Sequence, residues 1–390
     1  MSHQFSVTQQ TNIDRLALNC EDRYDSRNRR RMAQISTQQI HDLYKDPEQC
    51  AKHLRLQYIQ DFSNGYRQEK HGRGLRFFDS NNQPVKDRKE IKSLTELRIP
   101  PAWQDVWICP NDNGHIVAIG TDEEGRKQYR YHQRWTTFRR LLNSYRLIPF
   151  GSALSAIRTQ TAQINANTPI TAETTLLAAI RLLDDTWIRI GMPNEDGEAV
   201  GLLTLEEEHV EVGRDAVTLE FTGKSHKDHE IEVDDKPLTK FIAALVDTGD
   251  DEIFSFTNSD GDVEVICAED LNNALKELSG EDISAKDFRT WGGTLTAFQF
   301  LIKHPERNKK ARETVVKNAI VEASEELGNT PAVARAHYVH PHVVEEYRKG
   351  RLIKEVENIQ LAKPIPHLTK DEQRLMLYLE QLLARQAVIA

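Results

Sequence analysis

Apolar residues change their spacing near residue 138, and this change limits the folds open to the chain. Before it, runs such as VWICPNDNGHIVAIG alternate apolar and polar residues around an Asn/Gly turn, which is typical of a β-hairpin. After it, AETTLLAAIRLLDDTWIRIG places apolar residues at helical intervals. The sequence therefore predicts an α+β chain, with a small β-rich domain over residues 51–137 and a mainly helical domain over residues 138–345.

The length of 390 residues supports this division, because one hydrophobic core rarely serves so long a chain. Two appendages are expected beside the two domains. Residues 1–50 are rich in Gln, Asn and Arg and have weak periodicity, which indicates a partly disordered arm or a short helix around residues 32–44. Residues 346–390 are predicted to form a helical tail.

The helical domain contains a β insert. The segments HVEV, AVTLEF and HEIEV alternate, and glycine-containing turns separate them. Helices are expected again at AEDLNNALKEL, at a segment that begins near Ser284, and at ARETVVKNAIVEASEEL, which ends at Gly328. Thr330 is then a good N-cap for a short helix with Pro331 at its first position, and this helix carries Tyr338.

Composition indicates a protein of the reducing cytoplasm. No apolar run is long enough for a membrane span, and MSHQFSVTQQ lacks the pattern of a signal peptide. The cysteines contain no C-x-x-C pair, so neither a disulfide framework nor a zinc ribbon is expected. They are Cys20, Cys50, Cys109 and Cys267.

Charge is unevenly distributed along the chain, whose net charge is −9. Residues 51–150 carry +7, residues 151–390 carry −16, and residues 1–50 are neutral overall. A local basic face can hold a polyanion even when the whole molecule is acidic. The basic segment over residues 51–150 is thus a candidate site for a polyanion, and the acidic segment over residues 151–390 should weaken non-specific affinity for one.

Neither metal nor nucleotide chemistry is expected from the motifs. His337, His340 and His342 lack an H-E-x-x-H pattern, and no second cluster accompanies them. The lone glycine pair at residues 72–74 is not a phosphate-binding loop, and no Walker motif is present. We therefore expect no metal site and no cofactor, although magnesium is expected to stimulate turnover.

One predicted strand mixes cationic, amide and aromatic side chains. Tyr129 and Tyr131 share a face by the two-residue period of a strand. An exposed strand with ordinary cross-strand pairs would have this composition, and so would a surface that contacts phosphates and base edges. The candidate DNA-binding residues are Arg126, Lys127, Gln128, Tyr129 and Tyr131.

Tyr338 is either an ordinary half-buried aromatic residue or a nucleophile. A tyrosine that attacks a phosphodiester needs cations near the non-bridging oxygens and an acid for the leaving oxygen. Arginine suits the first task because its planar group grips phosphate at two points, and a lysine on a turn suits the second. The chain offers such residues in separate motifs, namely Arg189, Lys224, Arg289 and Asn329.

These motifs, in this order, resemble those of type IB DNA topoisomerases of the bacterial and poxvirus kind. RIPPAWQDVWICPNDNGHIVAIGTDEEGRKQYRYH is similar to the N-terminal DNA-clamp segment of that family. IRIG, FTGKSHKDHE, KDFRTWGGT and LGNTPAVARAHY carry the five catalytic positions. The resemblance covers about residues 53–350.

The resemblance implies a monomeric enzyme, an isomerase, whose two domains close around duplex DNA. Tyr338 would attack the backbone to give a DNA 3′-phosphotyrosine and a free 5′-hydroxyl, with Lys224 as general acid. Arg189, Arg289 and Asn329 would stabilise the phosphorane. Religation would need no ATP, because the covalent bond conserves the phosphodiester energy, and swivelling between the two steps would relax positive and negative supercoils.

Two departures from the family pattern bear on this expectation. Asn329 stands where poxvirus members have histidine, and its amide can still donate to a phosphate oxygen. The segment IGMPNEDGEA is acidic and lacks the lysine and tyrosine with which poxvirus enzymes help to read a preferred site, which predicts weak sequence preference.

Two alternatives remain open from the sequence. A tyrosine recombinase also uses arginine, lysine and tyrosine side chains for catalysis. It usually carries His-x-x-Arg at the second arginine, and this chain has Lys286 at the position of that histidine, three residues before Arg289. A non-catalytic DNA-binding protein would bind DNA without ever forming a covalent adduct.

Overall fold

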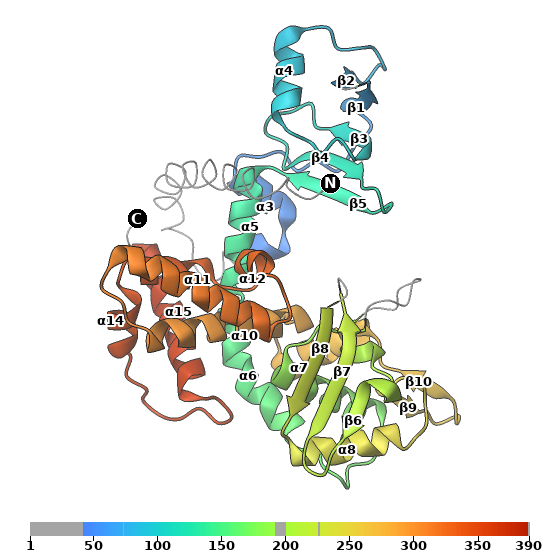
Figure 1. Ribbon diagram of the computed structural model, residues 1–390, viewed down its shortest axis with the longest axis vertical. Helices are drawn as coiled ribbons and strands as arrows, with labels where there is room; N and C mark the ends of the chain where they lie inside the picture. The colour runs from blue at the N-terminus through green and yellow to red at the C-terminus, as the bar shows by residue number, and fades with distance from the viewer. Residues whose placement is uncertain (1–41, 73, 192–199, 225–226, 389–390) are drawn as a thin grey trace, which may run out of the picture. The chain divides into compact units, whose positions relative to one another are not determined.

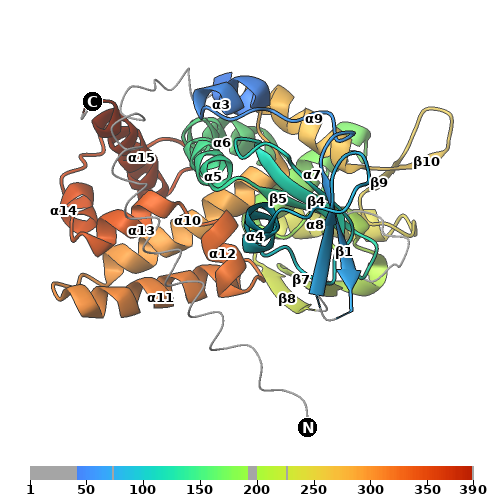
Figure 2. The same ribbon diagram turned by 90° about the horizontal axis from the view of Figure 1, so that it is seen from above.

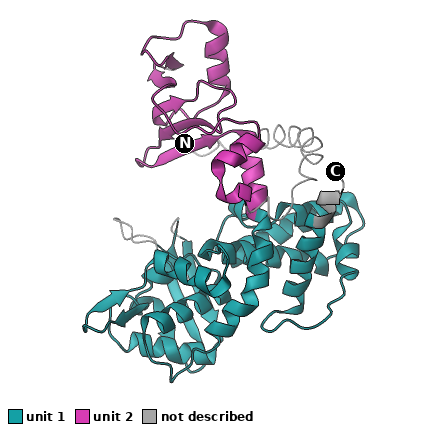
Figure 3. Ribbon diagram, turned by 180° about the vertical axis from the view of Figure 1, so that it is seen from behind, with its two compact units in different colours: residues 1–33, 144–390 teal, residues 34–143 magenta. Residues whose placement is uncertain are grey.

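The computed structural model describes residues 42–388 apart from residues 73, 192–199 and 225–226. The chain divides into two compact units, Gln34–Asn143 and Ser144–Ala390 (Figure 3). Most of the predicted N-terminal arm, and most of the short helix predicted around residues 32–44, lies outside the described residues. No helix in the described ranges has the length and apolarity needed to cross a membrane.

The first unit is built on an antiparallel five-stranded sheet in the order β2-β1-β3-β4-β5. Both segments predicted as strands around an Asn/Gly turn are confirmed as β3 and β4. At the turn between β4 and β5, the Asp122 carboxylate accepts from the backbone N–H groups of Glu124 and Arg126, and Gly125 has a φ of +75°. The strands are β1 (Tyr66–His71), β2 (Gly74–Phe78), β3 (Gln104–Ile108), β4 (Ile116–Thr121) and β5 (Lys127–Tyr131).

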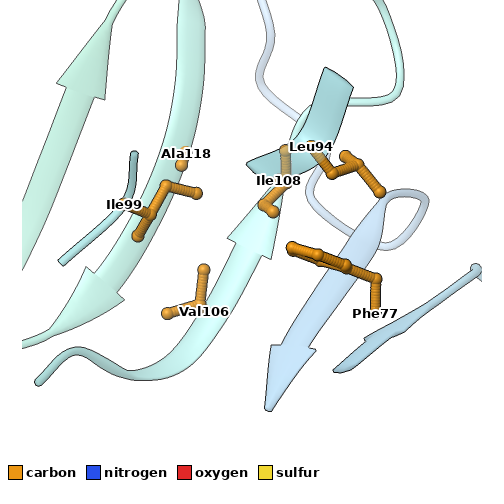
Figure 4. Close-up of a cluster of buried hydrophobic side chains, with 6 residues drawn as sticks. All are labelled: Phe77, Leu94, Ile99, Val106, Ile108 and Ala118. Atoms are coloured by element: carbon orange, nitrogen blue, oxygen red, sulfur yellow. The ribbon is translucent and has the colours of Figure 1, made fainter. Parts of the chain in front are cut away.

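Helix α4 (Arg88–Glu96) closes the core of this unit. Asp87 begins the helix by accepting from the N–H groups of Lys89 and Glu90. Leu94 then packs into a cluster of buried apolar side chains that come from β2, β3, β4 and the segment after α4. Figure 4 shows this cluster, whose members are Phe77, Leu94, Ile99, Val106, Ile108 and Ala118. The short helix α3 (Pro47–His53) precedes the sheet.

The second unit is mainly helical, as predicted. Its central helix α10 packs against α6, α11, α13 and α15, so α10 is a support for residues from several motifs. The first long helix, α5, begins at Gln133 rather than near residue 138 and spans the boundary between the units in the sequence. The helices are α5 (Gln133–Tyr145), α6 (Leu147–Thr161), α7 (Ala172–Thr186), α8 (Lys236–Val246), α9 (Ala268–Ser279), α10 (Ala285–Lys303), α11 (Lys309–Glu326), α12 (Pro331–His337), α13 (Pro341–Arg348), α14 (Leu352–Glu357) and α15 (Lys370–Val388).

The predicted β insert is an antiparallel sheet of three strands, β6 (Val210–Val212), β7 (Val217–Gly223) and β8 (Lys227–Val233). Within this unit, the sheet and α8 lie at one end and α11, α14 and α15 at the other (Figures 1 and 2). A further hairpin of β9 (Ser255–Thr257) and β10 (Val263–Val265) was not predicted, because strands of three residues are too short to show a period.

The C-terminal tail is helical in two pieces, α14 and α15, rather than throughout. Residues 358–369 between them are not helical, and Pro364 and Pro366 in this segment cannot supply the N–H groups that a helix needs. Helix α15 is not a loose appendage, since Leu375, Tyr378 and Leu379 are fully buried. It packs against α6 and α10 and so belongs to the core of this unit.

Candidate active site

Tyr338 stands at the C-terminal end of α12. The Thr330 hydroxyl accepts from the Val333 N–H to begin this helix, as predicted, and Tyr338 ends it as the C-cap. The carbonyl of Tyr338 accepts a hydrogen bond of 3.0 Å from Thr294 Oγ1 on α10. The same oxygen of Thr294 accepts from the His340 N–H at 3.1 Å. The backbone on either side of the tyrosine is thereby fixed to α10, and its ring is buried.

Arg289 lies in the first turns of α10, and its guanidinium carbon is 5.0 Å from the centre of the Tyr338 ring. Its Nη2 donates to the Leu327 carbonyl at 2.8 Å, and its Nη1 donates to the Trp187 carbonyl. Both carbonyls belong to C-cap residues, so the cation meets the negative ends of α7 and α11. No described carboxylate forms an ion pair with Arg289, and its positive charge is therefore not neutralised.

The start of α10 is itself held in place. Ser284 donates from its backbone N–H and its hydroxyl to the Asp287 carboxylate, both at 2.8 Å. Arg146 forms an ion pair of 2.7 Å with the same carboxylate. This capping box confirms the predicted start of the helix at Ser284, and it fixes the turn from which Arg289 projects.

Arg189 and Asn329 form a direct pair. Nη2 of Arg189 donates to Oδ1 of Asn329 at 2.7 Å, which leaves the amide nitrogen of Asn329 as the remaining donor. Gly328, with a φ of +60°, ends α11 and turns the chain so that the Asn329 N–H bonds to the Ser324 carbonyl. Among the described residues, neither Nδ2 of Asn329 nor Nε of Arg289 has a hydrogen-bond acceptor, although both atoms are buried.

The charges of the site act on the Tyr338 hydroxyl. Burial on its own would raise the pKa of this phenol. Attraction to Arg289, a hydrogen bond from Arg289, and the charges of Arg189 and Lys286 outweigh burial, and the pKa lies below its ordinary value of 10.0. The environment thus favours the phenolate, which is the nucleophilic form of the side chain.

Lys224 is the one predicted catalytic residue that the structure does not bring into contact with the others. It is exposed and directly follows β7 at the turn toward β8. No hydrogen bond or ion pair joins it to another described residue, and residues 225–226 of its turn lie outside the described ranges. Most of the acidic segment after Arg189, residues 192–199, also lies outside them.

Two residues near the site were missed by the sequence analysis. Lys286 precedes Arg289 by one helical turn, and its charge helps to lower the pKa of Tyr338; the (i, i+3) spacing could have indicated that the two cations share a face of their helix. His229 on β8 is influenced by the charges of Arg189 and Arg289, although it is far from both in the sequence. Its position depends on how β8 packs, and no local pattern predicts that.

Of the histidines near Tyr338, His340 has a structural role. His340 is the N-cap of α13 and is fully buried, and its Nδ1 accepts from the His342 N–H at 3.2 Å. Burial holds the pKa of His340 well below its ordinary value, so the ring is neutral. In the described chain these histidines form no group with the spacing of metal ligands.

The strand predicted to bind DNA has two different faces. Tyr129 and Tyr131 are exposed and stacked, with ring centres 6.1 Å apart, and Lys127 Nζ lies 5.7 Å from the centre of the Tyr129 ring. Gln128 alternates to the other face and donates to the Asp122 carboxylate at 2.7 Å. Arg126 is paired with the same carboxylate. Three of the five predicted residues therefore form one exposed surface, and the other two are bonded to Asp122 at the turn between β4 and β5.

Comparison with known proteins places both units in one family. Residues 145–363 match the model of the catalytic core of eukaryotic DNA topoisomerase I, and residues 74–122 match that of the N-terminal domain of bacterial DNA topoisomerase IB. The chain is 28% identical over 303 residues to DNA topoisomerase 1B of Acanthamoeba polyphaga mimivirus, a match that covers 73% of this chain and 88% of the viral protein.

A second relative is DNA topoisomerase 1B of vaccinia virus, strain Copenhagen. It is 25% identical over 289 residues, which is 70% of this chain and 87% of the viral protein. The family models cover strands β2, β3 and β4 of the first unit and the segments of the second unit that carry Arg189, Arg289 and Tyr338. The chain belongs to the type IB DNA topoisomerases, the isomerases that bind DNA and change its topology.

Proposed function

We propose that this topoisomerase relaxes positive and negative supercoils through a transient single-strand break, with a DNA 3′-phosphotyrosine as intermediate and without ATP. The observation that carries the proposal is the Tyr338 phenol beside the unneutralised Arg289, with its pKa lowered. A structural tyrosine in a core would have no cations to outweigh burial, and its pKa would rise instead.

The reaction is an in-line displacement at phosphorus. Tyr338 loses its proton to solvent, and its oxygen forms a bond to phosphorus while the bond to the 5′ oxygen breaks. Lys224 gives a proton to that oxygen, because an alkoxide is a poor leaving group. In the return step the 5′ oxygen forms a bond to phosphorus and gives its proton to Lys224, while the bond from phosphorus to the Tyr338 oxygen breaks and releases the phenolate. The energy of the phosphodiester is conserved, so no nucleotide is consumed.

The donors left over at the site suit the charge of the transition state. One N–H group of Arg189 already donates to Asn329, and two nitrogens of Arg289 already donate to backbone carbonyls. The buried Nδ2 of Asn329 and Nε of Arg289 have no acceptor among the described residues, and we assign both to the non-bridging phosphate oxygens. Pre-positioned donors of this kind typically contribute about 3–4 kcal/mol each to transition-state stabilisation.

The exposed face of β5 is proposed to contact duplex DNA. Lys127 supplies a charge for a phosphate, and the stacked rings of Tyr129 and Tyr131 offer phenol groups to base edges. We further propose that the enzyme acts as a monomer whose two units close around the duplex, and that it works on the chromosome in the cytoplasm.

A plasmid relaxation assay tests the proposal. Relaxation is expected in excess EDTA and without ATP, on both negatively and positively supercoiled plasmid, because the cations at the phosphate are side chains. Denaturant trapping should leave protein on the 3′ end of the nick, where it blocks a 3′ exonuclease and not a 5′ exonuclease. Protein on the 5′ end, or activity lost in EDTA, would contradict the proposal, and DNA binding without any adduct would favour a non-catalytic protein.

A further inference from the structure

His229 lies between the two turns that carry Lys224 and Asn329. A Cβ atom on Gly223, the residue before Lys224, would come within 2.9 Å of Cδ2 and Nε2 of the imidazole. A Cβ atom on Gly328, the residue before Asn329, would come within 2.1 Å of Cε1 of the same ring. The imidazole therefore fills the space between two glycines and touches the backbone of both turns.

The ring is held in this position from its own sheet. His229 pairs with Phe221 across β7 and β8, and the two rings are stacked with centres 4.9 Å apart and an interplanar angle of 14°. Phe221 is buried, so its ring is a fixed surface on which the imidazole packs. Stacking of this kind restricts both side-chain torsions and turns a flexible residue into a rigid spacer.

The surroundings of His229 are those of the candidate active site. Burial lowers the pKa of the imidazole, and the charges of Lys227, Arg289 and Arg189 lower it further, against the opposite effect of Asp228. The ring is consequently neutral near pH 7 and adds no charge beside the two arginines. A neutral, rigid ring can set distances there without competing for the phosphate.

We propose that His229 is a positioning residue that fixes the Lys224 turn relative to the Gly328–Asn329 turn. The inference rests on the proposed function, since it assigns His229 to the placement of the general acid and of one phosphate ligand. Beyond Gly223, which pairs with Lys227, no described pairing of β7 and β8 continues toward Lys224. Contact between the imidazole and Gly328 thus sets where the end of the hairpin lies with respect to α11.

The first test is single-turnover cleavage by His229→Ala and His229→Phe. Loss of the ring should slow cleavage by about ten- to a hundredfold, because displacement of a catalytic group by about 1 Å can have that effect. His229→Phe keeps a planar ring on Phe221 and should recover most of the rate. His304→Ala is the matched control, since His304 is also stacked on a phenylalanine, Phe300, but at the far end of α10.

The second test distinguishes placement of the acid from general damage. A substrate with sulfur in place of the 5′ bridging oxygen needs no proton on its leaving group. The defect of His229→Ala should therefore be several-fold smaller on the sulfur substrate than on the oxygen substrate. Equal defects on both substrates, or a wild-type rate on the oxygen substrate, would overturn the proposal.

The third test uses the crowding at Gly223, whose φ is not in the left-handed region. Gly223→Ala should slow cleavage by pushing the ring or the turn aside. In the His229→Ala background the added methyl group has room, and Gly223→Ala should then have little further effect. Additive effects would refute a role for the ring contact. If the wild-type enzyme itself forms no adduct, the proposed function fails, and the failure is separate from that of His229.

Discussion

The Arg289 guanidinium lies 5.0 Å from the centre of the Tyr338 ring and also donates to the carbonyl of Leu327, two residues before Asn329. One side chain on α10 thus connects the two ends of the motif LGNTPAVARAHY, namely the tyrosine and the turn that presents the Asn329 amide. Because it bonds to two neutral carbonyls and pairs with no described carboxylate, its charge remains available to the phenol and to a phosphate. This relationship underlies the first two predictions.

Tyr338→Phe should bind duplex DNA with unchanged affinity and should not relax plasmid. The substitution removes the phenolic oxygen and retains the buried ring that packs beneath Arg289. Gel shift and plasmid relaxation measure the two properties on the same preparation. Relaxation at the wild-type rate would show that Tyr338 is not the nucleophile.

In Arg289→Gln, the cleavage rate should begin to increase at a higher pH than in the wild type. In the native protein, Arg289 is the main influence that lowers the pKa of Tyr338, so its loss lets burial raise that pKa. The phenolate then forms only in more alkaline solution. The measurement is single-turnover cleavage against pH on the 5′-sulfur substrate, which removes the need for a general acid.

Arg289→Lys is the control for this prediction, because it keeps the charge and loses the planar fork. In Arg289→Lys, the cleavage rate should increase at a pH closer to that of the wild type than in Arg289→Gln. This should hold even if the maximal rate of Arg289→Lys is low. The same profile for both variants would mean that the charge of Arg289 does not set the pKa of the nucleophile.

Lys224→Ala should slow cleavage of an ordinary substrate by about a hundredfold or more, which is the usual range for loss of a general acid. The 5′-sulfur substrate should restore most of the rate, because a thiolate leaves without a proton. Lys227→Ala, on the other side of the same turn, is the control and should have a normal ratio between the two substrates. Equal slowing on both substrates by Lys224→Ala would remove Lys224 from the acid role.

Substitution of Lys127, Tyr129 and Tyr131 together by Ala should weaken DNA binding, with little change in religation from a preformed adduct. These side chains form the exposed face of β5, in a unit that contains none of the five catalytic positions. Gln128→Ala should have a smaller effect, because Gln128 is bonded to Asp122 on the other face. A religation defect as large as that of Arg289→Ala would contradict this division.

How far the sequence predicted the site depends on the range of the interactions involved. Local chemistry predicted the beginnings and ends of helices, since Ser284, Gly328 and Thr330 act on backbone groups within a few residues. The resemblance supplied the catalytic positions. Neither could show that His229 contacts Gly328, because that contact joins β8 to the end of α11 across about a hundred residues of sequence.

The same reasoning explains the C-terminal tail. Its helical periodicity is visible in the sequence, but the surface that α15 covers is not. Arg158 on α6 forms ion pairs with Asp184 on α7 at 2.6 Å and with Glu372 on α15 at 2.8 Å. All three side chains are largely buried. A buried cation between two carboxylates from separate helices can be recognised only once the helices are in place.

Arg158→Ala should therefore destabilise the second unit strongly, by about 3–5 kcal/mol, since it leaves two buried carboxylates without their cation. Arg348→Ala, which breaks the more exposed pair with Glu313, should cost less than about 1 kcal/mol. Thermal or urea unfolding of the two variants measures the difference. Similar losses in both would mean that the Arg158 cluster adds little to the docking of α15.

The loss in Arg158→Ala should also depend on pH. Burial and mutual repulsion already act to raise the pKa of Asp184, and without Arg158 nothing at this cluster opposes them. A carboxyl group whose pKa is higher in the folded state than in the unfolded state favours folding at low pH, and this contribution is lost as the pH rises. The variant should thus be closest to wild-type stability in mildly acidic solution and furthest from it near neutral pH. A stability difference that does not change with pH would show that the two carboxylates separate or become hydrated when the arginine is removed.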